Sequence, residues 1–157
     1  MTLATHAVIG AALASTMPNQ PVVGICLAFA SHFVLDALPH WDYHLRSSQE
    51  DKANPLNNDL TIGRDFYFDL IKIGFDGLLG LVVGYWLFRQ PWGAIAAMLP
   101  DFLQFVYFKT RLTVIGWLQR FHMWIHTDRK IKNRPVFGIA LQVFLVAWVL
   151  LAVYVRS

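Results

Sequence analysis

Residues 31–44, with the sequence SHFVLDALPHWDYH, place histidine and aspartate side chains at the end of an otherwise apolar segment. His32 and Asp36 are four residues apart, so a helix presents both on one face. Pro39 ends that helix and turns the chain, so that His40 can fold back toward it. Ionisable groups in an apolar segment are expensive unless a partner holds them, so this stretch predicts a binding site at the end of a helix.

The composition indicates a membrane as the main surrounding of the chain. Of the 157 residues, 56% are apolar and 15% are charged, and the mean hydropathy is +0.45. Soluble domains are about half apolar and about a quarter charged. The length suits one domain, so we assign residues 1–157 to a single membrane-embedded unit. The lone cysteine, Cys26, excludes an internal disulfide.

The apolar residues form five segments, which predict an all-α integral membrane bundle with four to five transmembrane helices. A perpendicular crossing needs about 20 residues, so the first segment is too short to span alone. Pro-containing turns separate neighbouring segments. A further helix, lying at the membrane interface, is expected between residues 109 and 134. The five segments are residues 3–17, 21–38, 64–88, 92–108 and 136–155.

The basic residues predict the orientation. Ten of the 13 lie in two loops, residues 39–64 and 109–134, which share one side of a five-span bundle. The positive-inside rule places these loops and the N-terminus in the cytoplasm of a prokaryotic cell, with the chain as a multi-pass protein of the inner membrane. Trp117, Phe121 and Trp124, interleaved with Arg120, favour a helix at the headgroup level.

This orientation gathers the histidines and the aspartates of the apolar segments near one face of the membrane. A divalent cation, or two, would keep several carboxylates ionised in a low dielectric. Imidazole and carboxylate together suit Zn²⁺, with Mn²⁺ or Fe²⁺ as alternatives. The predicted metal ligands are His6, His32, Asp36, His40, Asp76 and Asp101.

Three further residues are candidates for catalysis. His122 and His126 repeat the spacing of four and can act as ligands or as a general acid. Asp42 can orient a ligand or move a proton. Simpler interpretations stay open: a hydrogen-bond network at the helix end, an anchor for the interfacial helix in the case of the two histidines, and a solvated loop around Asp42.

Two of the predicted ligands have structural alternatives of their own. Asp76 can pair with Lys72, which lies four residues before it on the same helix face. Asp101, directly after Pro100, can stabilise a break in its helix. Nearby, Gly77, Gly80 and Gly84 form a stripe of small residues that predicts close helix packing.

Four short motifs resemble those of bacterial inner-membrane metal-dependent hydrolases. They are Thr5-His6, the SHFVLD run of residues 31–36, the LPD of residues 99–101 and the pair His122 and His126. Their order differs from that family's, in which the SHxxxD segment comes late. The HxxxDxxPH pattern of residues 32–40 is also similar to a ligand segment of zinc-dependent phospholipase C. The resemblance implies a membrane-embedded hydrolase acting on a phospholipid.

The residues and the resemblance together predict a metal-dependent hydrolase that cleaves an ester, or a phosphoester, of a lipid at the cytoplasmic membrane boundary. The expected partners are membrane lipids, attracted by the basic cluster Arg129, Lys130, Lys132 and Arg134. No pattern favours nucleic acid. The alternatives are a metal-ion or proton transporter, which needs polar groups through the full membrane depth, and a metal-stabilised scaffold without catalysis.

Overall fold

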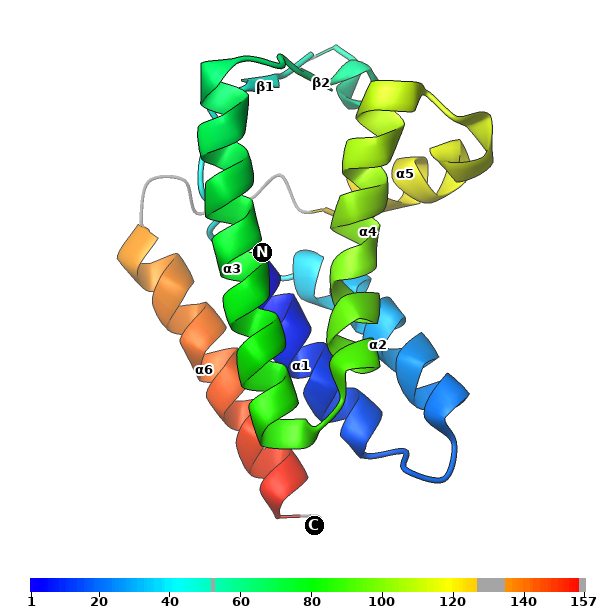
Figure 1. Cartoon of the computed structure of the whole chain (residues 1–157), viewed down its shortest axis with the longest axis vertical. Helices are drawn as coiled ribbons and strands as arrows, with labels where there is room; N and C mark the ends of the chain where they lie inside the picture. Colours follow the sequence, from blue (N-terminus) through cyan, green and yellow to red (C-terminus); the bar gives the residue numbers. More distant parts are fainter. Residues whose placement is uncertain (52, 127–134, 156–157) are drawn as a thin grey trace.

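The computed structural model of the chain describes residues 1–51, 53–126 and 135–155 (Figure 1). The prediction of an all-α fold is confirmed, and the five apolar segments are helices with nearly the expected bounds. A sixth helix, α5, lies where the interfacial helix was expected. The helices are α1 (Leu3–Ser15), α2 (Pro21–Asp36), α3 (Arg64–Phe88), α4 (Pro91–Thr110), α5 (Thr113–Ile125) and α6 (Pro135–Tyr154).

The short helix α1 is the centre of the bundle. It contacts α2, α3, α4 and α6, and Figure 1 shows it behind the antiparallel pair α3 and α4. Small residues allow these close contacts: a Cβ on Gly80 of α3 would lie 2.5 Å from the Cα of Ala4, and one on Gly10 would lie 2.4 Å from the Cβ of Ala97 on α4. The expected contact role of Gly80 is therefore confirmed.

Between α2 and α3 the chain forms a small hairpin that the sequence did not predict. Strand β1 (Ser48–Gln49) pairs antiparallel with β2 (Asp59–Leu60), and the one-turn helix η1 (Pro55–Asn57) lies between them. Asp69 of α3 holds one end of the hairpin by accepting hydrogen bonds from the backbone N–H (2.8 Å) and the hydroxyl (2.9 Å) of Ser47. Lys109 of α4 forms an ion pair with Asp59 at 2.6 Å.

The lengths of the helices bear on the predicted membrane spans. Among the described residues, α3 and α6 are long and apolar enough to cross a membrane. Helices α1 and α2 are apolar but shorter, with 13 and 16 residues. The basic cluster of residues 129–134 lies outside the described residues.

Hydrogen bonds from α3 and α6 show at which level of the bundle α1 begins. Asp76, the middle residue of α3, accepts a hydrogen bond from the backbone N–H of Ala4 at 3.2 Å. On the other side, the side-chain carbonyl of Gln142 on α6 accepts from the N–H of Thr2 at 3.1 Å. The first turn of α1 is therefore level with the middle of α3 and with Gln142 of α6.

Candidate metal centre

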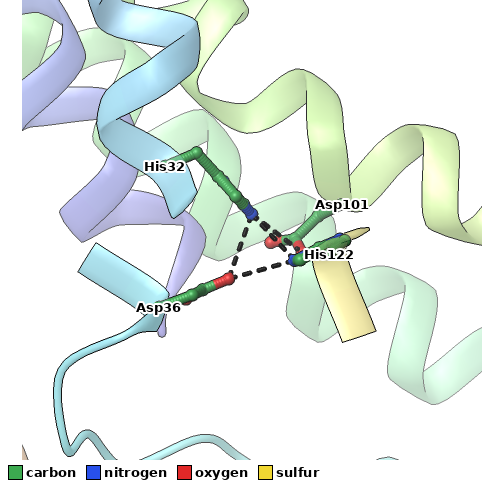
Figure 2. A group of neighbouring side chains, drawn as sticks. All are labelled: His32, Asp36, Asp101 and His122. Carbon is green, nitrogen blue, oxygen red and sulfur yellow. Dashed lines mark hydrogen bonds and ion pairs between the residues drawn. The ribbon is translucent and has the colours of Figure 1, made fainter. Parts of the chain in front are cut away.

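Four buried or half-buried side chains meet next to the start of α1 (Figure 2). His32 and Asp36 come from the last turns of α2, Asp101 from the middle of α4 and His122 from α5. One ligand atom from each lies within 4.8 Å of the other three. The i, i+4 spacing on α2 brings its two side chains together, while tertiary packing of three helices supplies the rest. We call these four residues the first group.

Five separations between ligand atoms of the first group, 3.1–3.8 Å, are close to those of a tetrahedral metal site. The Nε2 atom of His32 lies 3.2 Å from Nε2 of His122 and 3.1 Å from Oδ2 of Asp36. His122 Nε2 also lies 3.1 Å from Asp36 Oδ2. Asp101 Oδ1 is 3.5 Å from His32 Nε2 and 3.8 Å from His122 Nε2. Ligands about 2.0–2.2 Å from a central Zn²⁺ would be about 3.3–3.6 Å apart.

The hydrogen bonds of His32 explain why a cation fits between these atoms. Its Nδ1 lies 2.8 Å from the carbonyl oxygen of Ala97, which only accepts, so Nδ1 carries the proton. In the neutral form of His32, Nε2 therefore points a lone pair at two carboxylates and at His122. A proton on Nε2 of His122 can serve one of these contacts at a time, whereas a divalent cation at the centre satisfies all four ligands. The carbonyl of Ala97 also fixes the ring, as the outer partners of metal-bound histidines do.

A second group shares Asp36 with the first. Asp36, His40 and His126 also bring ligand atoms within 4.8 Å of one another. His40 donates from Nδ1 to the carbonyl of Leu38 at 2.7 Å, so its Nε2 again offers a lone pair. That Nε2 lies 3.2 Å from Oδ2 of Asp42, which in turn is 3.9 Å from Nε2 of His126. Asp36 therefore stands between two groups of donors.

His6 lies beside both groups without being part of either. Its ring stacks on His32 at 4.0 Å, and its Nε2 lies 3.3 Å from Oδ1 of Asp36. The side chain is completely buried, and its Nδ1 has no hydrogen-bond partner among the described residues. The structure thus brings this predicted ligand to the centre, in contact with the carboxylate that the two groups share.

The amino group of Met1 is a contributor that the sequence did not reveal. It forms ion pairs with Oδ1 of Asp36 at 2.9 Å and with Oδ1 of Asp42 at 2.8 Å. Burial alone would lower the pKa of this amino group, but the neighbouring carboxylates outweigh burial and raise the pKa above its ordinary value. A cation is therefore stable between these two carboxylates.

Asp76 is the predicted ligand that the structure places elsewhere. It belongs to neither group among the described residues, and its carboxylate accepts the N–H of Ala4 at the start of α1. Depth along α3 made it a candidate, but its helix face points to the backbone of α1.

Tyr43 lies beside Asp76, and burial, followed by the charges of Asp76, Asp101 and Asp42, raises the pKa of the Tyr43 phenol. The phenol therefore stays protonated near neutral pH.

The two buried groups can hold a metal ion. Comparison with protein-family models, with curated proteins and with solved structures gives no match for this chain. The donor set and its geometry therefore carry the functional argument.

Proposed function

We propose that the protein is a membrane-embedded, metal-dependent hydrolase that cleaves an ester or phosphoester of a lipid. The observation that carries the proposal is the convergence of His32, Asp36, Asp101 and His122, whose lone pairs and charges call for a cation. The resemblance of the four motifs to inner-membrane metal-dependent hydrolases, and of residues 32–40 to zinc-dependent phospholipase C, supports the same reaction class.

Zn²⁺ fits this donor set best, because imidazole and carboxylate at tetrahedral separations are its preferred ligands. Mn²⁺ and Fe²⁺ accept the same donors and remain the alternatives. When bound, such an ion supplies Lewis acidity and lowers the pKa of a coordinated water. His32, Asp36, Asp101 and His122 would hold one ion, and Asp36, His40 and His126 would hold a second.

The exposure of the side chains indicates where a substrate enters. The side chains of His6, His32 and His40 are fully buried, whereas Asp101, Asp42 and His126 are 29%, 23% and 16% exposed. The open side of the centre is therefore lined by these three residues. There, when a single ion occupies the first group, His126 can donate a proton to a leaving oxygen. Asp42, whose Oδ2 lies 3.2 Å from Nε2 of His40, can move a proton at the open side.

An inverted distribution of polarity supports a membrane location. The largest fully buried side chains are four histidines, Asp36 and Pro100, while large apolar residues such as Phe75, Trp86 and Trp148 are 61–71% exposed. Soluble proteins show the reverse tendency, and contiguous exposed apolar surface of this kind fits lipid. On α5, Trp117 and Trp124 are 70% and 79% exposed, which supports contact with the membrane interface.

The positions of the charged residues support a multi-pass arrangement with the centre on the cytoplasmic side. Beyond the level of Asp76 and Gln142, residues 77–88 of α3 and 143–154 of α6 contain no Asp, Glu, Lys, Arg or His. The same holds for residues 7–15, 21–31 and 91–100 of the other helices. A transporter needs polar groups through the full depth, so this one-sided distribution favours an enzyme over a transporter.

The proposal is tested by metal analysis and a hydrolysis assay on the purified full chain. We expect at least one zinc per chain and release of product from short-chain phospholipids. His32→Ala should remove most of the zinc and the hydrolysis, while His44→Ala, from the same stretch but outside both groups, should keep both. Protein that binds no divalent metal when offered it would overturn the proposal. Metal without hydrolysis across ester and phosphoester lipids would instead favour the scaffold.

A further inference from the structure

A pocket separate from the metal centre gathers three cationic side chains. Arg46 of the loop after α2 and Arg64 and Lys72 of α3 line a cavity of about 350 Å³, together with Phe68 and Asp69. Its residues come from the charged half of α3 and from the chain that leads into β1. None of them belongs to either metal-ligand group.

The charges of this pocket are not balanced from within. The carboxylate of Asp69, its single acid, is occupied by the N–H and hydroxyl of Ser47 and by Lys72 at 3.2 Å. Among the described residues, Arg46 makes no ion pair or hydrogen bond, and the contact recorded for Arg64 is with the ring of Phe68 at 5.5 Å. The guanidinium groups of Arg46 and Arg64 therefore line the cavity without a carboxylate partner.

We propose that this pocket binds a phosphate group. Guanidinium groups offer paired N–H donors that match two oxygens of a phosphate, and a lysine adds a further charge beside them. Asp69 acts as the support, because it fixes Ser47, next to Arg46, and holds the ammonium of Lys72 in place. The cavity is large enough for a phosphate with part of the group esterified to it.

The pocket and the metal centre are connected through residues 40–44. His40 and Asp42 stand at the centre, while Lys72 donates to the carbonyl of His44 at 2.8 Å and lies 5.3 Å from the ring of Tyr43. A phosphate held by the pocket is therefore attached to the same short segment that carries a metal ligand. The inference goes beyond the proposed function, because phosphate binding here needs neither the metal nor hydrolysis.

The test measures binding to the purified full chain in a neutral detergent. The probes are inorganic phosphate and short-chain phosphatidic acid, with phosphatidylcholine of the same chain length for comparison, and the readouts are calorimetry and phosphorus NMR. The variants are Arg46→Gln, Arg64→Gln and the double variant. Arg89→Gln is the matched control, because it removes the same charge at the opposite end of α3.

We expect each pocket substitution to weaken binding about tenfold and the double variant about a hundredfold, with unchanged zinc content and thermal midpoint. Arg89→Gln should bind like the parent chain, and higher salt should weaken binding because the groups are exposed. Binding of inorganic phosphate and phosphatidic acid alike identifies phosphate itself as the ligand. Binding of phosphatidic acid alone identifies a lipid headgroup.

The proposal is overturned if neither phosphate probe binds, or if the double variant binds as tightly as the parent chain. An equal loss in Arg89→Gln also overturns it, because the attraction would then be a general effect of charge. If a single variant fails to fold, Lys72→Gln in the parent background supplies a further removal of one pocket charge. Loss of the metal centre by His32→Ala should leave phosphate binding intact, so the two proposals fail separately.

Discussion

The Nε2 atoms of His32 and His122 lie 3.2 Å apart, although 90 residues separate them in the sequence. The carbonyl of Ala97 fixes the proton of His32 on the far side of its ring, so two ring nitrogens and two carboxylates approach one point. A divalent cation at that point would be bound by the two ring nitrogens and the two carboxylates together. The approach of these four side chains leads to predictions about how much metal the protein binds and how the binding depends on pH.

Asp36 and Asp101 should differ in how much metal their loss removes. Asp36 belongs to both groups, whereas Asp101 belongs to the first alone. We therefore expect Asp36→Asn to abolish metal binding and Asp101→Asn to lower the affinity of one ion about ten- to a hundredfold. Metal counting by mass spectrometry at fixed free zinc measures this difference. Equal losses from the two variants would contradict the shared position of Asp36.

Metal affinity should depend steeply on pH. The ligand form of histidine is the neutral ring, so protons compete with the metal for the ring nitrogens as the pH falls. Affinity should therefore decrease from neutral toward acid pH. Because the first group holds two histidines, the slope should approach two protons per ion. A chelator competition series from about pH 5.5 to 8 measures it, and His122→Ala should flatten the slope.

Asp76 should contribute to stability without contributing to metal binding. Its carboxylate accepts the N–H of Ala4 at the start of α1, which is the role of a helix cap supplied from another helix. Asp76→Ala should lower the free energy of unfolding by about 1–2 kcal/mol and leave the zinc content unchanged. Asp65→Ala, an exposed residue of the same helix, serves as the control. A loss of zinc in Asp76→Ala would return this residue to the ligand set.

Gly80 and Gly74 should respond oppositely to the same substitution. A Cβ on Gly80 would lie 2.5 Å from the Cα of Ala4, so alanine there forces α1 away from α3. We expect Gly80→Ala to cost about 1–3 kcal/mol. Gly74 has nothing within 4 Å of such a Cβ, so alanine there should be neutral or stabilise the helix by up to about 1 kcal/mol. Thermal unfolding of the two variants compares them, and equal midpoints would contradict close packing of α1 against α3.

The sequence predicted the helices well because each apolar run is bounded by proline or polar residues. Pro21 and Pro91 stand at the first positions of α2 and α4, where their fixed φ angle suits a helix start. The hairpin was missed because two-residue strands carry no recognisable alternation of apolar and polar residues. Its stability comes from Asp69 and Lys109, which are distant in the sequence.

The candidate metal centre was partly predictable. The spacing of His32 and Asp36 identified one pair, since helical geometry alone brings such residues together. Which residues of other helices would join them depends on packing, so the division into two groups around Asp36 was not predicted. Asp76 was assigned from its depth along α3, but depth does not reveal which neighbour a helix face meets. The amino group of Met1 belongs to the backbone, so no motif of side chains could predict its place beside Asp36.

Beyond the metal centre, α3 and α6 each continue for twelve residues, 77–88 and 143–154. At about 1.5 Å per residue this is about 18 Å of helix, against about 30 Å for the hydrocarbon core of a bilayer. Helix α6 is apolar over its full 20 residues, about 30 Å, so a spanning α6 would place the level of Gln142 inside the hydrocarbon core and not at its edge. We expect the exposed side chains of His126 and Asp101 to draw water and lipid ester groups down to that depth, so that a lipid bond reaches the ion without leaving the bilayer.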